Sequence, residues 1–121
     1  TGVEVSSGAI SSAISAARHA GLSRSAASFI ADDATSWARA QSPEDVPDVI
    51  VVNPPRRGIG ADLAAYLNEC DAPRVIYSSC NPASLATDLA AMPTLRPVEG
   101  RIFDMFPHTT HAEVALLLER A

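Results

Sequence analysis

A cysteine and a glutamate are the residues of this sequence best suited to covalent and acid–base chemistry. Cys80 follows an apolar run and directly precedes Asn81 and Pro82, a pair typical of the start of a helix. The N–H groups at a helix N-terminus stabilise a thiolate, so we predict that Cys80 is a nucleophile. The alternative is a small hydrophobic side chain of the core. Glu113 enters an apolar strand, where a catalytic carboxylate and a satisfied, hydrogen-bonded one are both natural.

Three further polar side chains, Glu4, Asp33 and Asn53, stand where predicted strands end. Ligands of open α/β sheets bind at the carboxyl ends of the strands. Glu4 can accept hydrogen bonds from both hydroxyls of a ribose, or be a solvated turn acid. Asp33 can accept from an adenine amino group, or cap a helix. Asn53 precedes two prolines, so its amide and the carbonyls beside it can orient a ligand; the alternative is a rigid turn.

Two arginines follow Asn53 and its two prolines, and two histidines lie near the end of the chain. Arg56 and Arg57 can contact a phosphate or remain solvated. His108 and His111 form an H-x-x-H-x-E pattern with Glu113, but this spacing does not match a usual zinc site, and we assign no metal ligand to the chain. We expect Met105 and Phe106, just before this pattern, to be packing residues; the alternative is a role in recognition.

The composition limits the classes of protein that fit. The chain has 121 residues and 47% hydrophobic composition, enough for one domain with a core. It contains nine arginines and no lysine, which excludes Schiff-base chemistry and a P-loop. The net charge of −5 has the wrong sign for a domain that holds nucleic acid by phosphate neutralisation alone. Two cysteines form no disulfide framework, and with no signal segment a cytoplasmic location is expected.

Strand and helix signals alternate along the chain. Strands are expected at residues 1–5, 26–30, 48–52, 74–78, 95–103 and 113–118, with helices at 7–21, 34–40, 60–70 and 82–92. The run 48–52 is apolar throughout, as expected for a parallel strand buried on both faces. The last two strands follow each other directly, which favours an antiparallel pair. We therefore predict an α/β fold with a doubly wound, mostly parallel sheet and an antiparallel end.

Three motifs, in this order, resemble those of a known family. They are NPPRRGIG at residues 53–60, YSSCNP at 77–82, and DMFPHT followed by HAEV between 104 and 114. Together they resemble the RNA uracil-5-methyltransferases that use S-adenosylmethionine. Most members have Asp-Pro-Pro-Arg where this chain has Asn53, and the Asn form is similar to the branch that acts on 23S ribosomal RNA. The resemblance implies a Rossmann-like class I methyltransferase sheet.

The resemblance also implies a role for each candidate residue. Cys80 would add to C6 of uracil, which makes C5 nucleophilic enough to attack the methyl group of S-adenosylmethionine. Glu113 would then remove the C5 proton, so that the thiol is eliminated. Glu4 would hold the cofactor ribose and Asp33 would lie near its adenine. Asn53 would replace the family's aspartate at the cofactor and substrate edge, which removes a formal charge from that position.

Parts of the family pattern do not occur in these residues. Before the position of Glu4, members have a strand with a Gly-rich cofactor loop and, further upstream, an RNA-binding region. Residues 1–121 are therefore expected to be the C-terminal part of the methyltransferase domain, truncated at its N-terminus. We expect this piece alone to bind cofactor poorly, to be inactive, and to self-associate through unpaired strand edges.

Two other functions fit parts of the pattern. In an N-methyltransferase, Asn53 and the prolines would orient an amine and Cys80 would be packing, although such an edge usually ends in an aromatic residue and here Arg56 follows. In a noncatalytic interaction module, the free strand edges would pair with another chain.

Overall fold

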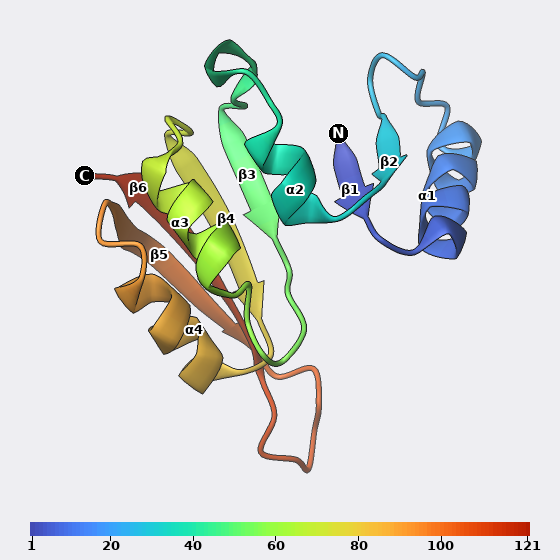
Figure 1. Cartoon of the computed structure of the whole chain (residues 1–121). Helices are drawn as coiled ribbons and strands as arrows, with labels where there is room; N and C mark the ends of the chain where they lie inside the picture. The colour runs from blue at the N-terminus through green and yellow to red at the C-terminus, as the bar shows by residue number, and fades with distance from the viewer. The chain divides into compact units, whose positions relative to one another are not determined.

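The computed structural model describes all 121 residues, and the chain divides into two compact units, Thr1–Gln41 and Ser42–Ala121. Each unit has its own sheet, with two strands in the first and four in the second (Figure 1). No helix is both long and apolar enough to cross a membrane.

The first unit is built from a pair of parallel strands and two helices. Its elements are β1 (Gly2–Glu4), α1 (Ser7–His19), β2 (Phe29–Ala31) and α2 (Ala34–Arg39). Glu4 pairs with Ala31 at the carboxyl ends of the two strands. The predicted strand at 26–30 begins three residues later than expected, because the N–H groups of residues 26 and 27 bond the Ser23 carbonyl in a turn.

The second unit holds a mixed sheet with the strand order β3-β4-β6-β5. Its elements are a 3-10 turn η1 (Pro43–Asp45), β3 (Val49–Val52), α3 (Ala61–Glu69), β4 (Arg74–Ser79), α4 (Pro82–Ala90), β5 (Leu95–Phe103) and β6 (Glu113–Arg120). β3 and β4 are parallel, whereas β6 runs antiparallel to both β4 and β5. The predicted antiparallel end of the sheet is therefore confirmed.

The core of this unit lies between one face of the sheet and the helices α3 and α4, which Figure 1 shows on the same side. Alternate residues of the central strands point into this core, as the two-residue period of a strand requires. The buried cluster consists of Ala64, Leu67, Val75, Tyr77, Leu85, Met92, Leu95 and Leu118. Burial of these apolar side chains is the main source of the stability of the unit.

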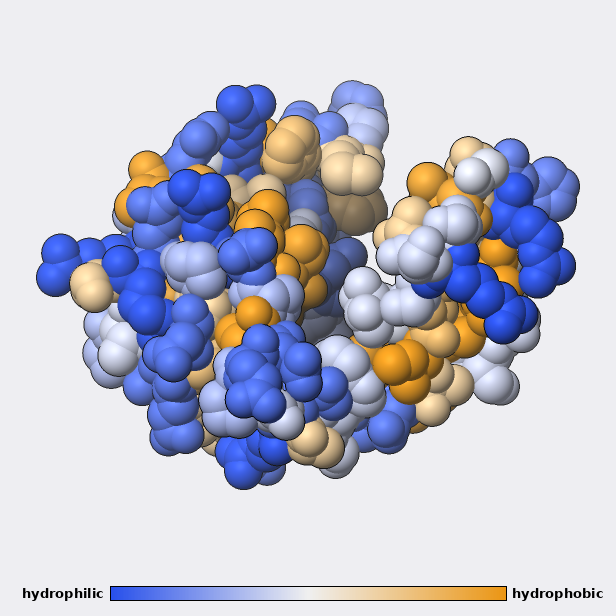
Figure 2. Space-filling model, turned by 90° about the horizontal axis from the view of Figure 1, so that it is seen from above, coloured by the Kyte–Doolittle hydropathy of each residue, from blue (hydrophilic) through white to orange (hydrophobic).

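One prediction about burial is wrong. We expected residues 48–52 to be buried on both faces, but Val49 and Val51 of β3 are 40% and 65% exposed. On the neighbouring strand β4, Ile76 is 37% exposed as well. The reason is that α3 and α4 both pack on the opposite face, the one that carries Val75. Apolar residues accordingly reach the molecular surface, as Figure 2 shows.

The expected packing of Met105 and Phe106 is also wrong. These residues lie in the loop between β5 and β6, where they are 65% and 42% exposed. Sequence alone suggested packing because both side chains are large and apolar, yet they lie in a loop that contains no helix, between β5 and β6.

Candidate active site at the carboxyl edge of the second sheet

The register of β4 with β6 brings two of the candidate residues together. Ser79, the last residue of β4, pairs with Val114. Continuing this antiparallel register by one residue places Cys80 opposite Glu113. A thiol and a carboxylate that are 33 positions apart in the sequence numbering therefore meet at one edge of the sheet.

The parallel register of β3 with β4 adds a third candidate to this edge. Val52 pairs with Tyr77, so the next step places Asn53 beside Ser78. Asn53 is exposed and is followed by the two prolines that end β3. The amide and the thiol thus follow the carboxyl ends of β3 and β4, and the carboxylate belongs to the first residue of the antiparallel strand β6.

The turn between β4 and α4 holds Cys80. Asn81 caps α4 by accepting a hydrogen bond from the Ala83 N–H at 3.1 Å, as the sequence predicted. Ser79 fixes the other side of the turn, because its Oγ accepts from the Asn81 N–H and donates to the Asn81 carbonyl, both at 3.0 Å. Cys80 itself is half-buried and lies outside the hydrophobic cluster. The thiol is therefore at the rim of the sheet.

A neighbouring hydroxyl orients the Glu113 carboxylate. Ser78 Oγ donates a hydrogen bond to Glu113 Oε1 at 2.5 Å across the β4 and β6 pair. Ser78 lies on the face of the sheet opposite Tyr77, which is packed in the core. Since Cys80 is two residues beyond Ser78, the thiol and the carboxylate share this open face.

The loop with the two arginines, residues 53–60, is anchored to α4. Asn81 Nδ2 donates to the Arg56 carbonyl at 2.8 Å, and the buried Asp88 accepts from the Ile59 N–H at 2.9 Å. The side chains of Arg56 and Arg57 remain exposed, and Arg56 Nη2 lies 3.5 Å from Nδ1 of His111. The loop backbone on both sides of Arg57 is thereby fixed beside the edge that carries the thiol.

Sequence reasoning missed Asp88, although a signal for it was present. Tyr77 also donates its hydroxyl to this carboxylate, and burial, followed by this hydrogen bond, raises the Tyr77 pKa far above its usual value of 10.0. Asp88 lies among Leu85, Leu89 and Met92, which recur at the three- and four-residue spacing of a helix. An acid within such an apolar stripe indicates a buried carboxylate with a specific partner.

The two remaining candidates belong to the first unit. Glu4 is exposed at the end of β1, and its Oε1 accepts a hydrogen bond from the Ser6 N–H at 3.0 Å. Asp33 caps α2 by accepting from the Ser36 N–H at 2.8 Å, and this bond lowers the Asp33 pKa below its usual value of 3.8. Asp33 therefore has the capping contact that was the alternative to cofactor binding.

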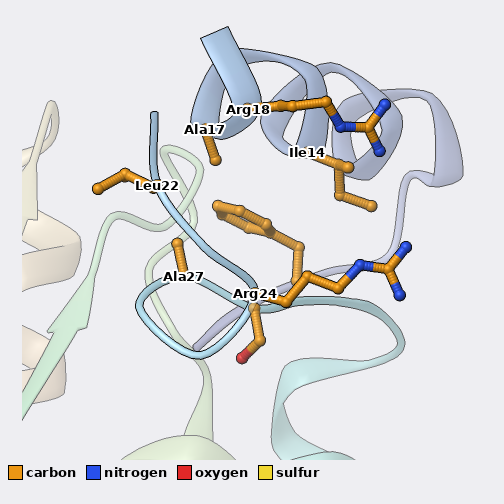
Figure 3. Close-up of a pocket in the computed structure, with 8 residues that line it drawn as sticks. Ile14, Ala17, Arg18, Leu22, Arg24 and Ala27 are labelled. Atoms are coloured by element: carbon orange, nitrogen blue, oxygen red, sulfur yellow. The ribbon is translucent and has the colours of Figure 1, made fainter. Parts of the chain in front are cut away.

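The structure shows no metal centre, and the cavity of the first unit contains none of the candidate residues. No group of three or more His, Cys, Asp and Glu side chains could hold a metal ion. A cavity of about 350 Å³ lies between α1 and the segment leading into β2. Figure 3 shows Arg18 and Arg24 on the same side of it, with Ile14 between them. None of the candidate residues lines this cavity.

Comparison with known proteins identifies relatives of the whole chain. The family model described as tRNA (uracil-5-)-methyltransferase matches residues 45–121. Proteins named 23S rRNA (uracil(747)-C(5))-methyltransferase RlmC are 44% identical in Pectobacterium atrosepticum, over 100% of this chain, and 49% identical in Escherichia coli K12, over 98%. The chain spans only 31% and 30% of the length of these relatives.

Solved structures confirm the predicted Rossmann-like methyltransferase fold. The crystal structure of Pyrococcus abyssi tRNA (uracil-54, C5)-methyltransferase in complex with S-adenosyl-L-homocysteine matches with a TM-score of 0.82 and 30% identity. It covers 97% of this chain, which corresponds to 27% of that protein. TrmN from Thermus thermophilus shares the fold at a TM-score of 0.70 and 22% identity, over 98% of this chain and 35% of that protein.

Proposed function

The chain belongs to the tRNA (uracil-5-)-methyltransferase family, and from this premise we propose that it is the C-terminal part of an enzyme that methylates C5 of a uridine in 23S ribosomal RNA. The relatives that match the whole chain carry this activity in their names, and the chain spans about a third of their length. Such a substrate implies a location in the cytoplasm.

The observation that carries the proposal is the position of Cys80 opposite Glu113 at the carboxyl edge of the sheet. C5 of uracil is too weak a nucleophile to take a methyl group unaided. The Cys80 thiolate adds to C6, a C–S bond forms, and the electron pair of the C5–C6 double bond moves toward C5 and the C4 carbonyl. C5 then has the electron density needed to attack an electrophilic methyl group.

The second half of the reaction needs a base. Once C5 carries both the methyl group and its original hydrogen, the Glu113 carboxylate accepts that proton. The electrons of the C5–H bond re-form the double bond, the C–S bond breaks, and Cys80 leaves as a thiolate. The hydrogen bond from Ser78 leaves Oε2 of Glu113 available for the proton and fixes the direction of the carboxylate.

S-adenosylmethionine would supply the methyl group as an electrophile on a sulfonium. The chain offers donors and acceptors that fit it: Glu4 uses only Oε1 for the Ser6 N–H, so its second oxygen can accept from a ribose hydroxyl. Asp33 and Asn53 are exposed acceptors at strand ends, suited to the adenine and to the edge between cofactor and uridine. Arg56 and Arg57 would contact RNA phosphates.

The test is adduct formation with RNA that contains 5-fluorouridine, using the full-length protein. Fluorine at C5 cannot be removed as a proton, so the methylated adduct should persist and migrate as a protein–RNA complex on a denaturing gel. Cys80→Ser should form none, whereas Cys70→Ser, which changes the other cysteine of the chain, should form as much as the wild type.

Two other results of this experiment would support the two alternative functions. Methyl transfer without an adduct would favour an N-methyltransferase and contradict the role of Cys80. Absence of any methyl transfer by the full-length protein would favour a noncatalytic module.

We further propose that the isolated 121 residues are inactive, bind cofactor weakly and self-associate. β3 has one unpaired edge, and Val51 on this strand is 65% exposed. Unpaired strand edges promote association between chains. Micromolar binding of S-adenosylhomocysteine in a calorimetric titration would contradict the first part, and a monomer in sedimentation would contradict the second.

A further inference from the structure

Helix α4 contacts the arginine loop at two points that lie on one face of the helix. Asn81, the N-cap, donates to the Arg56 carbonyl, and Asp88, seven residues later, accepts from the Ile59 N–H. Seven residues are about two helical turns, so both side chains face the loop. The loop is therefore held on both sides of Gly58.

The Asp88 carboxylate is built into this contact with little free space. The residue is only 6% exposed, and its Oδ2 accepts from both the Ile59 N–H and the Tyr77 hydroxyl. The raised pKa of Tyr77 keeps that hydroxyl protonated, so it remains a donor. A Cβ on Gly58 would lie 2.3 Å from Oδ2, so the loop backbone passes directly against the carboxylate.

The same helix also fixes the nucleophile. Cys80 immediately precedes the N-cap, and Ser79 ties that cap to the end of β4. One rigid element thus sets the position of the thiol and, through Asn81 and Asp88, the position of the arginine loop. The backbones of Arg56 and Cys80, which are 24 positions apart in the sequence, are thereby both attached to the start of α4.

We propose that Asp88 and Asn81 are positioning residues for RNA binding, which hold Arg56 and Arg57 in register with Cys80. This inference depends on the proposed function, because it assigns the arginines to the RNA substrate. Neither side chain touches the reacting atoms in this role. Their loss should weaken RNA binding and leave cofactor binding and the thiol itself unchanged.

The experiment compares three variants of the full-length protein. Asp88→Ala leaves the buried Tyr77 hydroxyl and the half-buried Ile59 N–H without an acceptor, and we expect the KM for RNA to rise about tenfold or more. Asp88→Asn keeps an acceptor oxygen and should restore the KM to within about threefold of the wild type. Asn81→Ser keeps a good helix cap but is too short to reach the Arg56 carbonyl, and should raise the KM about two- to tenfold.

The controls separate positioning from general destabilisation. Affinity for S-adenosylhomocysteine and the rate of Cys80 alkylation by iodoacetamide should stay at wild-type values in all variants. The Ile59 amide should exchange faster only in Asp88→Ala. Thr87→Ala, on the same helix, loses only a bond to the Ala83 carbonyl and should change none of these quantities.

Two results would overturn the inference. One is a wild-type KM for RNA in both Asp88→Ala and Asn81→Ser. The other is a loss of RNA binding that is matched by equal losses of cofactor affinity and thiol reactivity, which marks a structural role only. If Asp88→Ala does not fold, Asn81→Ser decides the matter. The proposed function fails separately, when the wild type itself forms no 5-fluorouridine adduct.

Discussion

Replacing Gly58 with alanine tests the close packing of the arginine loop against Asp88. Gly58 has a φ of 88°, a conformation that side chains with a Cβ rarely adopt. The new Cβ would also lie 2.3 Å from Asp88 Oδ2, so the carboxylate would have to move away from the Ile59 N–H and the Tyr77 hydroxyl. The substitution therefore carries a backbone penalty and a contact penalty.

The two penalties are of similar size, and a second substitution, Asp88→Ala, separates them. A positive φ costs a non-glycine residue about 1–2 kcal/mol. Loss of an acceptor for a buried donor costs about 1–3 kcal/mol. We expect Gly58→Ala to lower the free energy of unfolding by about 2–5 kcal/mol. In a protein that already carries Asp88→Ala, the Cβ has room and only the backbone penalty remains, so the coupling between the two substitutions is about 1–3 kcal/mol.

The assay is hydrogen exchange of the Val75 and Leu118 amides in the full-length protein. Both side chains are fully buried in the unit that contains the loop. Exchange of these two amides therefore reports the free energy needed to open the second unit. Gly60→Ala is the control within the loop, since Gly60 also has a positive φ of 80° but nothing lies within 4 Å of its Cβ. Equal costs of Gly58→Ala with and without Asp88 would refute the reasoning.

Three further predictions concern titration and the catalytic base. The Asp33 carboxylate stabilises α2 as a cap, and this stabilisation is fully present above the usual Asp pKa of 3.8. It is lost as the pH falls through the lowered pKa of Asp33, because the folded state favours the ionised form. Faster hydrogen exchange of the Ser36 amide at low pH should show this loss, and the Asp33→Asn variant should show no such pH dependence. Stability should decline above the usual tyrosine pKa of 10.0, since only the unfolded chain releases the Tyr77 proton there. Tyr77→Phe should reduce this decline in a denaturation series against pH, and the part due to Tyr66, whose pKa is also raised by burial, should remain. Glu113→Gln should accumulate a methylated covalent complex through Cys80 with ordinary uridine RNA, and rapid turnover without such a complex on a denaturing gel would contradict the role of the base.

The elements of the fold could be predicted from local signals. Asn81 and Pro82 marked the start of α4, Ser6 capped α1, and both helices begin where the sequence indicated. These signals act within a few residues, because a cap satisfies the N–H groups of the first helical turn. The pairing of neighbouring strands also followed: β3 and β4, which a helix connects, are parallel, and β5 and β6, which a loop connects, are antiparallel.

Burial was harder to predict from the sequence. The run VIVV reads as a strand covered on both faces, yet Val49 and Val51 are exposed. Whether a helix covers a given face depends on the side of the sheet on which each connection crosses. Apolar residues alone do not contain that information.

The candidate site, too, could be predicted from the sequence only in part. Residue type and the predicted strand ends placed Cys80 and Asn53, with Glu4 and Asp33, on one rim, and the resemblance of the motifs added Glu113 and a role for each residue. The register of the strands decided which of these residues lie together. Because Ser79 pairs with Val114, the Cys80 thiol lies opposite the Glu113 carboxylate. A shift by one residue would turn that carboxylate to the other face.

The sequence by itself determined which residues can react and which short segments carry them, because those properties arise from side-chain chemistry and from contacts within a turn or two. Only the tertiary structure decided that Asp88 reaches back 29 positions to the Ile59 N–H, and that Val49 and Val51 of the larger sheet stay exposed. Both facts depend on the packing of segments far apart in the chain, where space and hydrogen-bond partners are set by the whole fold.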